Sequence, residues 1–165
     1  MSVPLPEGAQ RVQDFLSGMD SLGRVRLLPD STATAPDAAA ALGVSVSQIG
    51  KSIVFGSDAG LVVAIVCGDQ KVAPDALASA LRTENVRLLK ADEVKAETGY
   101  AIGGVSPFAL PSSALIVVDS RLHGLPDCYV AAGHPKAVVH TNGRELVELT
   151  GARVEAITRG PGHDA

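Results

Sequence analysis

The feature that most constrains the fold is the apolar run Leu61–Cys67, which follows a glycine-bounded turn. A shorter apolar run, Ile53–Phe55, precedes the turn, which spans Gly56–Gly60. Two such runs joined by a short turn predict a β-hairpin. Because polar residues do not alternate with apolar ones in the second run, both faces of its strand should be covered. The sequence therefore predicts a sheet with this strand in its interior.

Other elements follow from capping signals and from apolar periodicity. The residues Val12, Phe15, Leu16 and Met19 have the spacing of one buried helix face. Hydroxyl, proline and acidic residues mark several further helix starts. We expect helices near residues 12–19, 34–42, 45–49, 74–82, 91–98 and 142–149. We expect strands at 25–28, 53–55, 61–67, 86–89, 114–119, 128–132 and 138–141, and residues 154–157 complete the fold. Only turns separate the three strands between 114 and 141, which favours antiparallel neighbours.

These elements predict one domain of the α+β class. The expected architecture is a mixed, mainly antiparallel sheet or partial barrel of about six or seven strands, flanked by helices. A chain of 165 residues suits a single domain. The domain is expected to span residues 1–158, with 159–165 as a disordered tail.

The composition excludes several classes of function. A net charge of −4 argues against a general nucleic-acid binder, and DNA is not expected as a partner. Aromatic residues make up 3% of the chain, which argues against stacking platforms for single strands. Cys67 and Cys128 lie in apolar runs without metal-ligand spacing, so buried, reduced thiols and a cytoplasmic protein are expected. No membrane span, metal or cofactor is predicted.

The stretch Gly103–Phe108 is the first candidate for a working site. Adjacent glycines let a ligand approach the backbone, whose N–H groups can stabilise an oxyanion. The proline after Ser106 holds that serine near an extended conformation, and Phe108 offers an apolar wall. A turn with a hydrophobic plug explains the same residues equally well.

Lys51 is the second candidate. It begins a strongly apolar strand, so its side chain either reaches solvent or points into a cleft. The sequence Gly50-Lys51-Ser52 resembles the end of a phosphate-binding loop, but Ser45 stands where that motif needs a glycine. His134, between a glycine and a proline at a strand end, is either a site residue or part of a surface turn. No serine-hydrolase motif supports a catalytic triad.

Taken together, these segments resemble the YbaK/ProX family, the free-standing relatives of the editing domain of bacterial prolyl-tRNA synthetase. The resemblance rests on segments found in order along nearly the whole domain. They are residues 34–55, 66–72, 98–100, 103–108 and 129–133, followed by the helix that contains Glu145.

The resemblance implies an aminoacyl-tRNA hydrolase, a carboxylic ester hydrolase that removes a wrongly attached small amino acid from tRNA. It implies that Lys51 and the glycines 103, 104 and 133 lie in the active site. The expected catalytic residues are Lys51, Gly103, Gly104 and Ser106. The expected substrate-binding residues are Ser52, Ile102, Val105, Phe108, Gly133 and His134. The implied partners are the acceptor end of tRNA(Pro) and a synthetase.

Two questions stay open at this point. Family members that remove alanine tend to carry asparagine after the lysine, whereas this chain has Ser52, so cysteine, alanine and 2-aminobutyrate are all possible substrates. A non-catalytic regulator that binds an amino acid or aminoacyl ester in the same pocket, and a general esterase, are the alternative functions.

Overall fold

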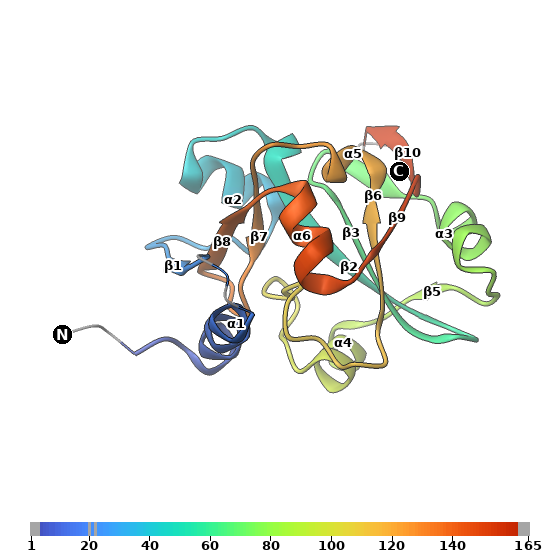
Figure 1. Ribbon diagram of the computed structural model, residues 1–165, viewed down its shortest axis with the longest axis horizontal. Helices are drawn as coiled ribbons and strands as arrows, with labels where there is room; N and C mark the ends of the chain where they lie inside the picture. The colour runs from blue at the N-terminus through green and yellow to red at the C-terminus, as the bar shows by residue number, and fades with distance from the viewer. Residues whose placement is uncertain (1–3, 20, 22, 162–165) are drawn as a thin grey trace.

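The structure is a computed structural model that describes residues 4–19, 21 and 23–161. Its main sheet has eight strands, seven of them in the order β1-β8-β7-β2-β3-β6-β9, with β5 paired to β2 (Figure 1). Their bounds are β1 Val25–Leu27, β2 Ile49–Ser57, β3 Gly60–Cys67, β5 Arg87–Leu88, β6 Leu115–Asp119, β7 Cys128–Ala131, β8 Ala137–Thr141 and β9 Arg153–Glu155. The sheet is mixed, because β3-β6, β6-β9 and β2-β7 are parallel and the other pairs are antiparallel. The predicted α+β class is confirmed.

The helices lie at the predicted positions, except that the first begins before residue 12 and the one at 120–123 was not predicted. Their bounds are α1 Glu7–Gly18, α2 Ala35–Leu42, the 3-10 turn η1 Val46–Gln48, α3 Pro74–Leu81, α4 Ala91–Thr98, α5 Ser120–His123 and α6 Gly143–Thr150. Thr34 and Asn142 accept the capping hydrogen bonds at the starts of α2 and α6. Met19 departs from its expected place in a buried face: α1 ends at Gly18, and the Met19 side chain is 48% exposed.

The strand Leu61–Cys67 is interior and covered on both faces, as predicted. Val63 and Ile65 pack with α1, α4, α5 and α6 on one face of the sheet, in one core cluster. Val62 and Val66 pack on the other face with Leu77 of α3. The two cysteines are buried as expected, and burial raises the pKa of Cys67 to about 11 and that of Cys128 to about 12.

The expectation that the strands between 114 and 141 are antiparallel neighbours is wrong for β6. β7 and β8 do pair antiparallel, but β6 lies between β3 and β9 and is parallel to both. The short helix α5 follows β6 directly, and the Asp119 carboxylate caps it by accepting from the Arg121 N–H. Val117 and Val118 are fully buried on opposite faces, the pattern of a parallel interior strand.

The chain end also differs from the expectation. The residues Thr158–Pro161 form β10, which pairs antiparallel with β4, Gln70–Val72. The Asp119 carboxylate accepts from the Ile157 N–H and from the Thr158 hydroxyl, which holds this segment against the sheet. Residues 159–161 are therefore part of a strand, and the rest of the expected tail, 162–165, lies outside the described residues.

Candidate functional site

A cavity lies beside a gap in the sheet. Beside β2, the partner β7 pairs as far as Gly50, and β5 begins to pair only at Phe55. Between them, no strand of the described residues pairs with 51–54 on the edge opposite β3. A half-open cavity of about 470 Å³ lies beside this edge. That volume lies within the range of small-molecule sites.

The cavity lining is mainly apolar and comes from several segments. Loop 32–34, α2, β2, β5, the start of α4, the loop after α4 and β7 all contribute to it. Its residues are Thr32, Ala33, Thr34, Ala35, Pro36, Ala38, Ile49, Gly50, Lys51, Ser52, Ile53, Val54, Gly68, Leu88, Leu89, Val94, Ile102, Gly103, Val105, Tyr129, Val130, Ala131 and Val138. The sequence analysis predicted Lys51, Ser52, Ile102, Gly103 and Val105 as site residues, and the structure brings all five to this cavity.

Lys51 is the one ammonium group in this lining. Its side chain is half-buried, and its Nζ donates a hydrogen bond of 3.3 Å to the carbonyl oxygen of Gly68. Burial lowers the pKa of Lys51 below its ordinary value, while the nearby Asp69 carboxylate acts in the opposite direction. A partly desolvated cation beside a cavity attracts an anionic or electron-rich oxygen more strongly than a solvated one does.

Ser52 follows Lys51 and, by strand alternation, points to the other face of the sheet. Its Oγ is buried and has no hydrogen-bond partner in the structure. By contrast, the hydroxyl of Thr32 donates to Pro135, and that of Thr34 accepts from Asp37. Because a buried polar atom normally has a partner, Ser52 Oγ is a candidate contact for a polar group of a ligand.

The backbone of Ser52 also faces the gap. The carbonyl oxygen of Val54 accepts from the Leu89 N–H on the edge away from β3. Alternate residues of a strand direct their N–H and C=O groups to the same edge, so the groups of Ser52 lie on this edge too. The cavity therefore has a main-chain donor and acceptor on its β2 side.

The segment 99–109, called here the cavity loop, also contributes to the lining. Gly103 lines the cavity with φ +89°, and a β-carbon there would lie 3.0 Å from the β-carbon of Ala33. The neighbouring Gly104 has a different environment: its N–H donates to the carbonyl oxygen of Ala101 at 3.0 Å. Gly104 therefore closes a turn, and its N–H is not free to bind an oxyanion in this conformation.

The structure places Ser106 and Phe108 in the core and not in the cavity lining. Both are 0% exposed, and the Ser106 Oγ accepts from the Phe108 N–H. The Phe108 ring stacks on Phe15 of α1, with 5.8 Å between the ring centroids. These contacts make the two residues the buried, structural part of the cavity loop.

Gly133 and His134 also lie outside the cavity lining. A β-carbon on Gly133 would collide with the Gly8 backbone in α1. A β-carbon on Gly104 would lie 2.9–3.0 Å from the His134 backbone, so this turn packs against the cavity loop. The His134 Nδ1 accepts from the Lys136 N–H. The Gly133–His134 turn therefore packs against the cavity loop at Gly104.

The sequence analysis did not predict that the loop 32–34, Leu88 and Leu89, and Tyr129 line the cavity. The sequence indicated Thr34 only as the N-cap of a helix, and Thr34 does cap α2. Leu88 is 63% exposed although it is apolar, and only the gap beside β2 makes it part of a site. The register of β5 and β7 against β2 assembles these residues, and the sequence did not predict that register.

The chemistry of the lining limits what the site can do. Within the described residues, no group of histidine, cysteine or carboxylate side chains could hold a metal ion. The lining contains no carboxylate, imidazole or thiol, and its side-chain polar groups are the Lys51 ammonium and the hydroxyls of Thr32, Thr34, Ser52 and Tyr129. Hydrolysis here would use backbone and lysine contacts rather than a strong general base.

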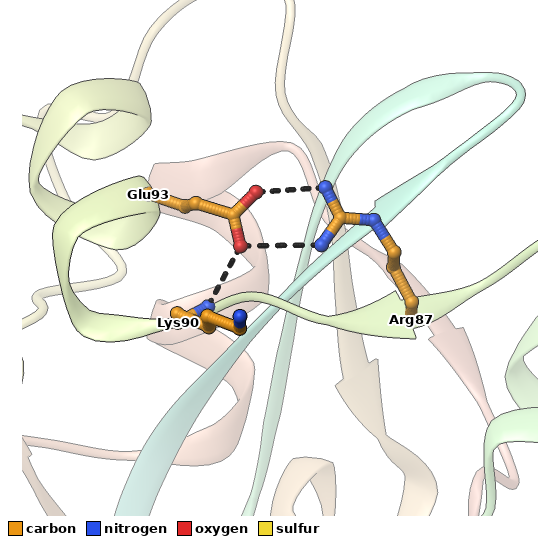
Figure 2. A network of polar contacts seen from close by, with 3 residues as sticks. All are labelled: Arg87, Lys90 and Glu93. Carbon is orange, nitrogen blue, oxygen red and sulfur yellow. Dashed lines mark hydrogen bonds and ion pairs between the residues drawn. The ribbon is translucent and has the colours of Figure 1, made fainter.

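An ion pair fixes the wall that contains Leu88 and Leu89. The Arg87 guanidinium donates two hydrogen bonds to the Glu93 carboxylate, which also accepts from the Lys90 N–H (Figure 2). These bonds tie β5 to the first turn of α4. The Arg87 hydrogen bonds, followed by the Lys90 N–H bond, lower the pKa of Glu93 from 4.5 to about 2.

This ion pair predicts a pH-dependent contribution to stability. Because the folded-state pKa of Glu93 is depressed, the contribution is present above about 4.5 and is lost as pH falls toward about 2. Glu93→Gln should lower the melting temperature at neutral pH, and the difference from wild type should shrink across that window. Glu97→Gln, an exposed change on the same helix, is the matched control. A difference that persists at the acid end would contradict the prediction.

The site is thus a largely apolar cavity with one lysine at the open edge of a mixed sheet, in a domain of the α+β class. The chain belongs to the aminoacyl-tRNA editing domain family, whose model matches residues 29–149. The resemblance drawn from the sequence is thereby confirmed. None of the helices in the described ranges has the length and apolar character that a membrane crossing requires.

Individual relatives agree with this assignment. The chain is 32% identical to the uncharacterized protein YwhH of Bacillus subtilis, over 75% of this chain and 79% of that protein. It is 27% identical to EbsC of Enterococcus faecalis, named as a candidate Cys-tRNA(Pro)/Cys-tRNA(Cys) deacylase, over 76% and 77%. A crystal structure described as a candidate trans-editing enzyme for prolyl-tRNA synthetase superposes with a TM-score of 0.88 and 34% identity. That superposition covers 95% of this chain and all of the other.

Proposed function

We propose that the chain is a trans-acting deacylase that hydrolyses the ester between a wrongly attached small amino acid and the 3′ end of tRNA(Pro). The observation that carries the proposal is Lys51, a partly buried ammonium at the gap in the sheet, beside an apolar cavity of about 470 Å³. The names given to EbsC and to the similar crystal structure support the choice of tRNA(Pro). The acceptor end of the tRNA is the partner, and a synthetase that charges this tRNA is a further one.

In this proposal, Lys51 binds the 3′-terminal phosphate or ribose of the tRNA, since a lysine ammonium is a strong donor to such oxygens. The amino acid enters the cavity between β2 and the cavity loop. Gly103 then brings the loop backbone to the ester carbonyl, where N–H groups stabilise the developing oxyanion. Gly104, whose N–H is bonded to Ala101, acts by holding the turn that presents Gly103.

Hydrolysis adds water to the ester carbonyl carbon and breaks the bond to the ribose oxygen, which leaves with a proton. The lining offers no carboxylate, imidazole or thiol to accept the proton of the attacking water. The water is therefore positioned by backbone groups, or assisted by the neighbouring hydroxyl of the substrate ribose. A catalytic amount of protein should release many equivalents of amino acid, whereas a non-catalytic binder would protect the ester.

The amino acid specificity should follow from the apolar walls. An apolar pocket rejects a larger side chain by steric clash but distinguishes smaller ones only by about 1–3 kcal/mol per methylene. We expect tRNA(Pro) carrying cysteine, 2-aminobutyrate or alanine to be deacylated at least about 10-fold faster than prolyl-tRNA(Pro). Single-turnover rates on the four substrates test this. A prolyl rate equal to the others would exclude an editing role.

A further inference from the structure

Arg11 of helix α1 forms hydrogen bonds with the backbone at both ends of the cavity loop. The Arg11 Nη2 donates to the carbonyl oxygen of Thr98 at 2.7 Å and to that of Ala109 at 2.9 Å. These two carbonyls stand at the two ends of the cavity loop, so one guanidinium group joins both ends. Between them lie Ile102, Gly103 and Val105, which line the cavity.

Tyr100 extends this contact into the loop. The Arg11 guanidinium carbon lies 4.0 Å from the centroid of the Tyr100 ring, within cation–π range. The Tyr100 side chain is 1% exposed, and its hydroxyl donates to the carbonyl oxygen of Phe108 at 2.6 Å. A continuous set of contacts therefore runs from α1 through Tyr100 to the far side of the loop.

Gly99 makes room for this arrangement. It has φ +81°, and a β-carbon there would lie 2.5 Å from the Arg11 Nη1. A residue with a side chain at position 99 would therefore push the guanidinium away from the loop. Gly8, in the first turn of α1, also contacts the Gly133 turn so closely that neither glycine could carry a β-carbon without displacement. The helix thus contacts both the cavity loop, which contains Gly103 and Gly104, and the Gly133 turn, which packs against Gly104.

The helix itself is fixed in the core. Ala9, Val12 and Leu16 are 0% exposed and belong to the same cluster as Phe108 and Val105. The segment Glu7–Gly18 lies entirely before residue 29, where the match to the family model begins. The contact is therefore between a helix outside the matched segment and a loop inside it.

We propose that Arg11 is a positioning residue that fixes the cavity loop over the cavity, so that α1 sets the geometry of the site. The inference rests on the proposed function for its kinetic consequence, but the effect on the loop can be measured without any substrate. Arg11 is not among the residues that line the cavity, and its hydrogen bonds go to the backbone at the two ends of the cavity loop.

The test compares Arg11→Met and Arg11→Lys with Gln10→Ala, an exposed change on the same helix. Amide hydrogen exchange in the segment 101–105, read at the Gly104 N–H that donates to Ala101, is measured well below the melting temperature of each variant. Arg11→Met should speed this exchange by about 10- to 100-fold, as expected for the loss of charge-assisted hydrogen bonds. Arg11→Lys keeps the charge and should restore part of the protection, whereas Gln10→Ala should change nothing.

The kinetic part of the test uses mischarged tRNA(Pro). Arg11→Met should lower kcat by at least about 10-fold with little change in KM, because the loop acts mainly at the reacting carbonyl. A variant with a lower melting temperature but normal exchange at 101–105 and normal kcat would overturn the inference. If wild type shows no deacylation, the proposed function fails, while the exchange result still decides the role of Arg11.

If Arg11→Met does not fold, a second variant still tests the proposal. Tyr100→Phe removes only the hydroxyl that donates to Phe108. It should speed exchange at 101–105 in the same direction but by less than Arg11→Met. Exchange equal to that of wild type in Tyr100→Phe would contradict a role of these contacts in holding the cavity loop.

Discussion

Replacement of Lys51 by methionine should lower the rate of deacylation by about 10²–10³ or more, while the melting temperature stays equal or rises. The loss in rate follows from the proposed contact with the tRNA terminus, since a removed charge-stabilising donor typically has an effect of this size. The gain in stability follows from burial, which lowers the pKa of Lys51 and so disfavours its charged form in the folded protein. Methionine has a similar length and no charge.

The effect of Lys51 on stability should depend on pH in a direction that follows from its lowered pKa. Because the folded-state pKa of Lys51 lies below its unfolded value, the unfolded chain binds more protons between the two values. The unfavourable contribution of Lys51 is therefore present at neutral pH and declines as pH rises through the folded pKa. The melting temperatures of wild type and Lys51→Met should converge in alkaline buffer.

Lys71→Met is the matched control, because Lys71 is close enough to Lys51 to affect its pKa. It should retain most of the deacylation rate, which would show that the position of the ammonium matters and not the local positive field alone. Wild-type turnover in Lys51→Met, measured on tRNA(Pro) charged with cysteine or alanine, would show that Lys51 has no part in the reaction.

Much of the fold was predictable because the deciding signals are local. The strand Leu61–Cys67 is apolar on both faces, and this alone placed it inside the sheet. The helix starts at Thr34 and Asn142 depend on a capping hydrogen bond three residues along the chain, a contact that sequence shows directly. The position of β6 was not predictable in this way, because a parallel pairing with β3 joins segments far apart in sequence.

The candidate site residues divide in the same way, into those with a local sequence signal and those that only the pairing of distant segments brings to the cavity. Lys51 and Gly103 stand out by type, as a charge beside an apolar strand and as one of a glycine pair. Phe108 stood out in the same way, but its ring points into the core and stacks on Phe15. Leu88 and Tyr129 carry no such signal, and only the sheet register brings them to the cavity.

Replacement of Gly103 by alanine should lower the rate of deacylation by about 10²–10³, with a smaller effect on tRNA binding. Two effects act together at this position. Its φ of +89° is unfavourable for alanine, and the added β-carbon would lie 3.0 Å from the Ala33 β-carbon, on the facing loop. The cavity loop must then shift away from the ester carbonyl, which weakens the backbone donors more than the phosphate contact of Lys51.

Gly151→Ala is the matched control, because Gly151 also has a positive φ, +69°, but has no atom within 4 Å of an added β-carbon and caps α6 away from the cavity. Both variants should lose stability from backbone strain, and only Gly103→Ala should lose kcat. Gly104→Ala provides a further comparison, since its β-carbon would meet the His134 backbone and move the loop from behind. Equal losses of rate and tRNA affinity in Gly103→Ala would mean that the loop holds the substrate without stabilising the transition state.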